Sequence, residues 1–398
     1  MNIRPITAEE AMQMAREHLA TTGWVAPRNE SFRHLPPPPA ALWLERTAEP
    51  PAAASGWTLS ALAGGAPEGA VARTLDATDT AQRAELFAGL SLPGDDDAAP
   101  FAWAHRALCT SGLRVQVGGG TEQQPTQLDL QHRPSQAVEA PLLVLDIAEG
   151  AHCVLRERHA AGGAGTVQNL QIHVRLGRGA SLQHLRILAP HVDDRCAHVV
   201  HAEVGEDARY VQAFVAGGSS YHLQRSQVLL GGAGASAHIA GITCAADTQF
   251  EQQVFMRHAA VRTTSHSEAL VLASGTARTV ANASTHIAAG ADEADVRQRL
   301  AGIPLGGQPR LVLRPHLEIY HDNVQAAHGA TWGALPEDAL FYARQRGLDA
   351  AAARALIIEG TAQDLLARAF PDAATLDALA QGDGLRSVLR QVLETAHG

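Results

Sequence analysis

Positive charge is scarce in this sequence, and lysine is absent altogether. All 31 cationic side chains are arginine, and the net charge is −10. A Walker A phosphate loop requires its lysine, and a Schiff-base enzyme requires a side-chain amine, so both classes are excluded. The acidic balance also argues against nucleic acid as the main partner, because phosphate binding requires a basic surface.

Cysteine and long apolar runs are scarce as well. The four cysteines are widely spaced, with no CxxC pair and no Cys/His cluster of zinc-site spacing. We therefore expect reduced, mostly buried thiols. No apolar run reaches the length of a membrane span, and the chain does not open with a basic segment followed by an apolar stretch. Neither a membrane span nor a signal peptide is expected, and the expected location is the cytoplasm.

The first of three regions, residues 1–97, is predicted to be helical with irregular, proline-rich loops. Thr7 and Glu10 have the spacing of a capping box, in which each side chain accepts a hydrogen bond from the other residue's backbone N–H. Helix-forming residues follow over 11–21. A second helix is predicted over 79–90.

The middle region, residues 98–330, has the alternating pattern of β-strands. Apolar and polar residues alternate at 113–117, at 170–176 and, most extensively, at 311–319. Residues 142–147 are almost entirely apolar, as in a strand buried on both faces. No helical stretch of crossover length separates these runs, so a doubly wound sheet is disfavoured. A sandwich, a barrel and a β-solenoid remain.

Similar turns recur between the runs. Each repeat consists of a turn that contains Gly or Glu, then a small residue, then a strand. Examples occur at 147–155, 176–185, 204–212 and 231–239. A repeated strand–turn unit cannot bury its apolar face alone, and stacking such units into coils solves the problem. The repeats therefore favour a solenoid.

The last region, residues 331–398, is predicted to be helical. Pro336 and two following carboxylates suit a helix N-terminus, and Gly347 suits its end. These helices could cap the last coil of a solenoid. Further helices are predicted at 349–359, 362–370 and 385–396.

Two segments carry family-like motifs: LEIYHDNVQAAHGAT at 317–331 and LPEDALFYARQRG at 335–347. They resemble the SufB/SufD family of the SUF iron–sulfur cluster assembly machinery, and within it the SufD branch. The resemblance is strong over residues 310–370 and weaker but collinear through the β-region. It implies a right-handed parallel β-helix, residues 98–330, between an N-terminal helical and irregular region, 1–97, and a C-terminal helical domain, 331–398.

The resemblance implies a non-catalytic scaffold subunit. In this family SufD pairs with SufB, each binds the SufC ATPase, and an iron–sulfur cluster forms transiently at the SufB–SufD interface, so no cofactor is expected to stay bound to the isolated chain. His328 matches the interface histidine, a candidate cluster or metal ligand. Many relatives have cysteine where this chain has Ala326. Phe341, Tyr342 and Arg346 match the segment that contacts SufC.

Adjacent helix positions point about 100° apart, so at least one of Phe341 and Tyr342 is expected to be buried. Most of the twenty histidines are expected to be solvated or hydrogen-bonded in the coil walls.

Two other function classes stay open. The first is a secreted-type β-helix enzyme acting on carbohydrate, which would need carboxylates that converge on one site. Glu318 and Asp322 lie four residues apart on a predicted strand, a distance of about 13 Å. This distance is too large for most mechanisms that use a pair of carboxylates. They are expected to be solvated or partner-facing. A structural, self-associating solenoid would bind no ATPase. The sequence is also compatible with a homodimer of the isolated chain that forms through its last strands. It is equally compatible with direct binding of iron or a flavin.

Overall fold

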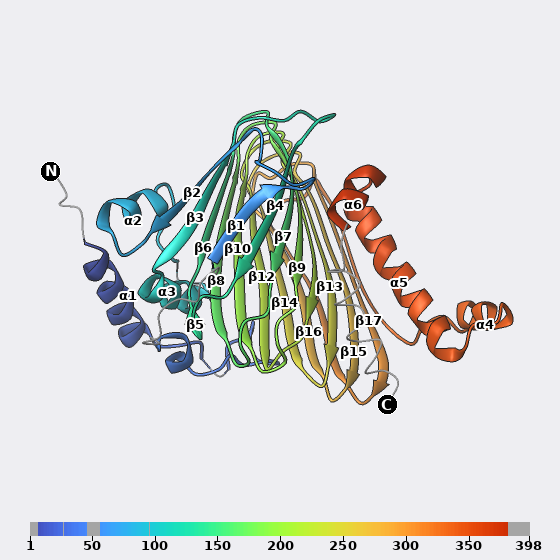
Figure 1. The fold of residues 1–398 in the computed structure, drawn as a ribbon. Helices are drawn as coiled ribbons and strands as arrows, with labels where there is room; N and C mark the ends of the chain where they lie inside the picture. Colours follow the sequence, from blue (N-terminus) through green and yellow to red (C-terminus); the bar gives the residue numbers. More distant parts are fainter. Residues whose placement is uncertain (1–6, 27, 46–55, 95, 381–398) are drawn as a thin grey trace.

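The computed structural model describes residues 7–26, 28–45, 56–94 and 96–380, and its main feature is a parallel β-solenoid (Figure 1). Successive strands of the solenoid alternate between two sheets, one of nine and one of ten strands, so that each coil contributes to both. Strands that are neighbours in a sheet belong to consecutive coils and are parallel, whereas β1–β4 and β2–β3 are antiparallel. The predicted mainly β, parallel solenoid with flanking helices is confirmed.

The strands of each sheet follow one another in the order of the coils. The nine-stranded sheet contains β1 (Gly56–Ala61), β4 (Thr126–Arg133), β7 (His152–His159), β9 (Ser181–Leu188), β11 (Arg209–Gly217), β13 (Ser236–Ala246), β15 (Thr264–Gly275), β17 (Ala294–Gly307) and β19 (Val324–Trp332). The ten-stranded sheet contains β18 (Arg310–Ile319), β16 (Arg278–Ile287), β14 (Gln249–His258), β12 (Tyr221–Leu230), β10 (Arg195–Val204), β8 (Val167–Leu176), β6 (Leu142–Ile147), β3 (Ser111–Val117) and β2 (Ala70–Asp76), with β5 (Val138–Glu139) beside β8.

The helices lie at the flanks of the two sheets (Figure 1). On the N-terminal side they are α1 (Ala8–Thr22), the 3₁₀ helix η1 (Ala40–Trp43), α2 (Thr80–Leu86) and α3 (Ala99–Leu108). On the C-terminal side they are α4 (Glu337–Gln345), α5 (Ala350–Ala369) and α6 (Ala373–Ala380). None of these described helices is both long and apolar enough to cross a membrane.

The recurring turns stack on one another from coil to coil. The Gly177 amide donates to the carbonyl of Ile147 at 2.9 Å, and the Gly205 amide donates to the carbonyl of Leu176 at 3.1 Å. The backbone groups of one turn are thus satisfied by the turn below, which a single coil could not achieve. This arrangement explains why similar turn sequences repeat.

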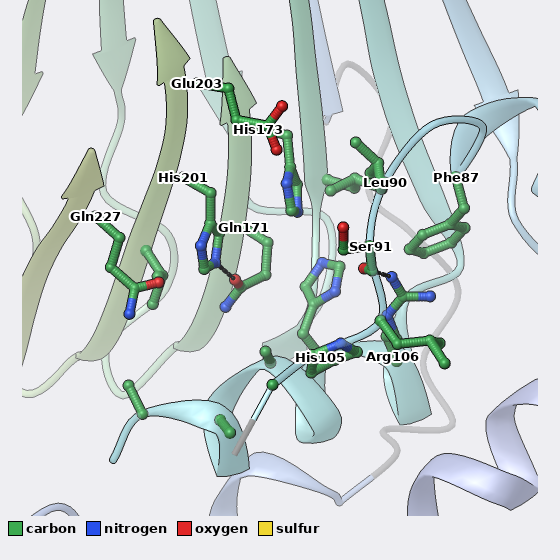
Figure 2. A pocket seen from close by; sticks show the side chains of 18 of the residues that line it. Phe87, Leu90, Ser91, His105, Arg106, Gln171, His173, His201, Glu203 and Gln227 are labelled. Atoms are coloured by element: carbon green, nitrogen blue, oxygen red, sulfur yellow. Dashed lines mark hydrogen bonds between the residues drawn. The ribbon is translucent and has the colours of Figure 1, made fainter. Parts of the chain in front are cut away.

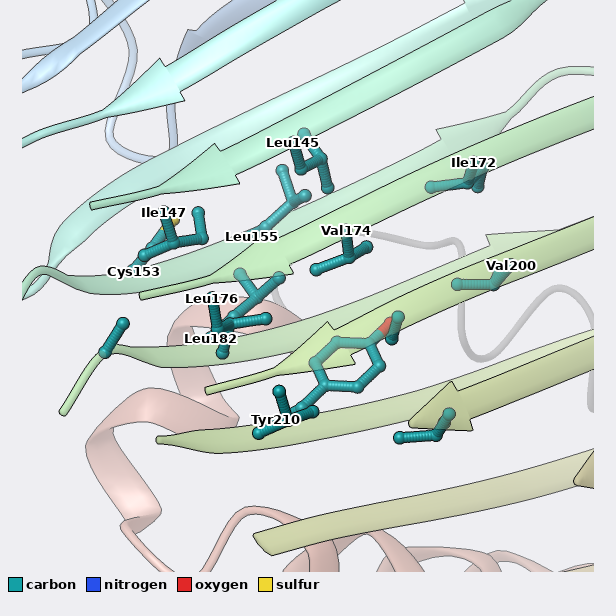
Figure 3. Close-up of a cluster of buried hydrophobic side chains, with 14 of the residues drawn as sticks. Leu145, Ile147, Cys153, Leu155, Ile172, Val174, Leu176, Leu182, Val200 and Tyr210 are labelled. Atoms are coloured by element: carbon teal, nitrogen blue, oxygen red, sulfur yellow. The ribbon is translucent and has the colours of Figure 1, made fainter. Parts of the chain in front are cut away.

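The core lies between the two sheets. Along each strand, side chains point alternately into and out of the solenoid, and those that point inward form a continuous apolar cluster. A fully buried Leu, Ile or Val side chain contributes about 1.5–3 kcal/mol to stability. Members of this cluster from both sheets, shown in Figure 3, include Leu145, Ile172, Val174, Val200, Leu155, Leu182 and Tyr210.

The N-terminal helices cover part of the outer face of the ten-stranded sheet. Helix α3 contacts β8, and η1 contacts both. The ring of Trp43 lies 5.2 Å from that of Phe101 and 6.1 Å from that of Tyr221. The predicted capping box is confirmed, since the Thr7 side chain accepts from the Glu10 amide.

The sequence does not predict α3, β1 or β2. Helix α3 lies in a region expected to consist of strands, and the two strands lie in a region expected to be helical and irregular. A ten-residue helix is marginal by itself in water, so its packing against α1 and β8 decides its conformation. Strands β1 and β2 likewise obtain their ladder hydrogen bonds from β4 and β3, which lie far along the chain.

The first C-terminal helix agrees with the prediction, and the second differs from it. Helix α4 follows Pro336 and ends before Gly347, whose φ of +91° suits glycine. Helix α5 is one helix of 20 residues where two are predicted, because its buried face outweighs the cost of Gly360, about 1 kcal/mol. The helix predicted at 385–396 lies outside the described residues.

The expected cap over the last coil is not formed by the described C-terminal helices. Helix α5 packs on β11, β13 and β15, the outer face of the nine-stranded sheet. Its buried residues, including Ile358, Leu365 and Leu366, join an apolar cluster with that face. The apolar stripe of α5 is therefore buried against the side of the solenoid, and none of the described C-terminal helices packs on its end.

Candidate functional site

The last coil of the solenoid, made of β18 and β19, is called the open coil here, because no other described strand pairs with its free edges. These strands terminate the two sheets, so each pairs with a neighbour on one side only. Every residue of β19 after Val324 is exposed. An uncovered sheet edge presents unpaired N–H and C=O groups that another chain can pair with.

The side chains of β19 continue the inner face of the solenoid. Gln298 and Leu300 on β17 are buried, and Leu300 belongs to an apolar cluster between the sheets. Residues paired in register share a face of the sheet. The register pairs Gln298 with His328, Leu300 with Ala330, and Gly302 with Trp332.

This placement gives the open coil a core-like surface in contact with solvent. Trp332 is 69% exposed although it lies on the inward side, close to Gly302. Ile319 at the end of β18 is 44% exposed. Exposed apolar groups next to unpaired strand edges are typical of surfaces that bind another protein.

His328 lies in the middle of this surface and is exposed. Its side chain makes no hydrogen bond or ion pair with any described residue. Nowhere in the described ranges do three or more His, Cys, Asp or Glu side chains come together to hold a metal ion. The described residues therefore supply no complete set of metal ligands around His328. Ala326, two residues earlier on the same face, supplies none.

The cysteines do not take part in such a site. All four are free and buried, as expected. Burial raises the pKa of the Cys109 thiol to about 11 and that of Cys153 to about 12. Because the thiolate is the form that binds metals, these groups are poor ligands at neutral pH.

Helix α4 presents a second exposed surface. Phe341 is 66% exposed and Tyr342 is 60% exposed, so the expectation that one of them is buried is wrong. Arg346 donates a hydrogen bond to the Tyr342 hydroxyl, and its guanidinium lies 4.5 Å from the centre of the Tyr342 ring. The helix packs on α5, which leaves no core available to either aromatic residue. No described hydrogen bond or ring contact joins these residues to His328.

A histidine–glutamate cluster on the outer face of the last coils escapes sequence reasoning. Glu318 accepts a hydrogen bond from His316 at 3.1 Å and pairs with His286 at 3.4 Å. The bonds from His316 and then His286 lower the pKa of the Glu318 carboxyl. His286 and Glu318 meet only because β16 and β18 pair in register, so no local pattern could reveal them. Asp322 is exposed.

The solenoid also encloses a polar network. The fully buried carboxylate of Glu157 accepts from the Arg186 Nε at 3.0 Å, and it is bonded to His159 at 2.5 Å and His184 at 2.7 Å. Burial by itself raises the pKa of Glu157, but Arg186 and the two imidazoles outweigh it and hold that pKa well below its usual range. This network supports the wall of the solenoid and lies away from the open coil.

These features define a class: a β-solenoid with an uncovered last coil and an exposed aromatic helix. Residues 131–361, more than half of the chain, match the family model described as SUF system FeS cluster assembly, SufBD core domain. The chain therefore belongs to the SufBD family of the SUF iron–sulfur cluster assembly system. The resemblance found in the sequence is confirmed at this level.

Two curated relatives are similar over part of their length. The chain is 24% identical to the iron–sulfur cluster assembly protein SufD of Escherichia coli (strain K12) over 226 residues, which are 56% of this chain and 53% of that protein. It is 38% identical over 72 residues to the iron–sulfur cluster assembly SufBD family protein slr0076 of Synechocystis sp., covering 18% of this chain and 16% of that protein. The chain thus matches about half, or less, of the length of these relatives.

Proposed function

We propose that this chain is a scaffold subunit for iron–sulfur cluster assembly that pairs with a SufB subunit through its open last coil. The observation that carries the proposal is the combination of unpaired strand edges with core-like side chains on β19. A second solenoid docked end to end would satisfy both, because it would pair the edges and bury Trp332 and Ala330. The chain itself would perform no catalysis.

The same proposal gives α4 the contact with SufC. Phe341 and Tyr342 form an exposed aromatic pair, and Arg346 holds the Tyr342 ring in place. Tyrosine and arginine are enriched among the few residues that dominate the binding energy of protein interfaces. ATP hydrolysis would belong to SufC, consistent with a chain that has no lysine for a phosphate loop.

The cluster would be cargo shared between two chains. His328 offers one imidazole at the centre of the open coil, and the remaining ligands would come from SufB. An iron–sulfur cluster held in this way leaves no cofactor on the isolated chain. The proposal assigns the remaining ligands to SufB because no group of three or more His, Cys, Asp or Glu side chains comes together among the described residues.

Co-purification with SufB and SufC from the same source tests the two surfaces separately. We expect Ala330→Arg to remove SufB from the complex and to keep SufC, because a charged side chain cannot be buried in the paired coil. We expect Phe341→Glu to keep SufB and to lower the SufC content of the complex by the copy bound to this chain, since SufB still binds its own SufC. Each variant is thus the folding control for the other. A complex of unchanged subunit stoichiometry with both variants would refute the assignment, and a complex of two copies of this chain alone would favour the self-associating solenoid.

His328→Ala is expected to lower the yield of cluster assembled on the complex several-fold while partner binding and the melting temperature stay unchanged. The imidazole is exposed and makes no described contact, so its removal costs little stability. Cluster formation is followed by visible absorption during anaerobic reconstitution. A variant that melts earlier and assembles normally would instead assign His328 a structural role.

A further inference from the structure

A cavity of about 170 Å³ lies between α3, the loop that follows α2 and the outer face of the ten-stranded sheet (Figure 2). Phe87, Leu90 and Ser91 line it from the loop, and Arg106 and His105 line it from α3. The sheet contributes side chains of β6, β8, β10 and β12. The cavity shares no lining residue with the open coil or with α4.

The loop side of the cavity carries unneutralised positive charge. The guanidinium groups of Arg83 and Arg106 lie 4.8 and 4.6 Å from the centre of the Phe87 ring. Arg106 donates to the carbonyl of Ser91 at 2.8 Å, and Arg83 donates to backbone carbonyls. Within the described residues, neither guanidinium has a carboxylate at ion-pair distance. Burial lowers the pKa of Arg106 only to about 10, so it remains cationic at neutral pH.

The sheet side adds to this excess. Arg175 lines the cavity and shares the carboxylate of Asp146 with Arg114, which is not itself a lining residue, at 2.6 and 2.9 Å. Of the two acids at the mouth, Asp96 is paired with Arg225, and Glu203 is exposed. In a chain of net charge −10, this is a local concentration of cations that an anionic ligand would neutralise.

Three neutral imidazoles complete the lining. Burial lowers the pKa of His105 to about 3 and that of His201 to about 4. His105 is bonded to the carbonyl of Pro141 at 3.0 Å, and His201 to the side-chain oxygen of Gln171 at 3.1 Å, so both bonded nitrogens carry protons. His173 stacks on His201 at 4.9 Å and has no described hydrogen bond. It is free to donate one to a ligand.

We propose that this cavity binds a small organic carboxylate, with its anionic end between Arg106 and His173. Leu90, Leu142 and Val199 supply an apolar wall for the rest of the molecule. The volume suits a single ring, since an apolar cavity of about 150 Å³ accepts benzene. A metal ion is disfavoured, because the three imidazoles do not converge as a ligand group.

Ligand-observed fluorine NMR with 3-fluorobenzoate tests the site on the isolated full chain. We expect saturable binding that Arg106→Gln weakens about tenfold or more, because a charge-assisted hydrogen bond is lost. Arg209→Gln, which removes an exposed arginine from the nine-stranded sheet, should leave binding unchanged. The neutral analogue 3-fluorobenzamide should bind much more weakly.

Ala102→Leu provides a second variant, which fills the cavity from α3 and keeps every charge. We expect it to abolish binding while circular dichroism and melting stay close to those of the unmodified chain. Absence of saturable binding at millimolar concentrations, equal binding of the amide, or binding that survives both Arg106→Gln and Ala102→Leu would overturn the proposal.

Discussion

Replacing Glu157 by alanine is expected to destabilise the folded chain by about 3–5 kcal/mol, because it leaves the buried Arg186 without its counter-charge. The two imidazoles bonded to the carboxylate lose their acceptor at the same time. The free energy of unfolding is measured by urea titration at neutral pH. A matched control is Glu206→Ala, which removes an exposed carboxylate that pairs with Arg178 and should cost less than about 1 kcal/mol.

Two further measurements separate charge from packing. The double variant Glu157→Leu/Arg186→Leu should recover much of the loss, because a buried ion pair can often be replaced by apolar residues. Since the folded-state pKa of Glu157 is depressed, its contribution is present above the unfolded pKa and disappears as the pH falls through the folded value. Unmodified protein should therefore lose stability on acidification more steeply than the double variant. Equal stability of Glu157→Ala and Glu206→Ala would contradict this account.

Gly232→Ala is expected to cost about 2–3 kcal/mol or to prevent folding, because the turn stack leaves no room for a Cβ. A Cβ at Gly232 would lie 2.0 Å from the amide nitrogen of Glu206 and 2.3 Å from the carbonyl carbon of Gly205. Both are backbone atoms of the coil below, so neither can move without breaking the stack. Thermal melting and soluble yield report the effect.

The neighbouring glycine provides a close control for this substitution. A Cβ at Gly231 would find its nearest atom, a side-chain carbon of Leu229, at 3.7 Å, an ordinary contact. Gly231→Ala should therefore change stability by less than about 1 kcal/mol. Similar losses from both substitutions would mean that the cost arises from general strain of the turn and not from close stacking of coils.

The residues of the candidate site could be predicted where they lie within the family-like motifs. The LEIYHDNVQAAHGAT and LPEDALFYARQRG segments led to His328, Phe341, Tyr342 and Arg346, and the structure places all four on exposed surfaces. Their exposure itself was not predictable. The sequence of α4 contains an aromatic pair that would be half buried on an ordinary helix. Only the docking of α4 on α5, away from any sheet, leaves both rings in solvent.

Sequence alone determined the features that depend on near neighbours in the chain. Period-two alternation marks the strands, because adjacent side chains point to opposite faces. Thr7, Glu10 and Gly347 mark helix ends, because capping acts within a few residues. The recurring turns indicate a solenoid for the same reason, since each coil repeats one local unit.

Only the tertiary structure decided which coils meet and which surfaces stay open. Glu157 and Arg186, like His286 and Glu318, are one coil apart, and no local pattern links residues at that separation. Helix α5 docks on the side of the nine-stranded sheet because its apolar stripe fits that face, and the residues of β19 after Val324 stay exposed. The cavity beside Arg106 likewise exists only because α3 and the loop after α2 close over β8 and β10. Long-range packing, which no window of sequence records, therefore set the surfaces to which we assign the proposed function.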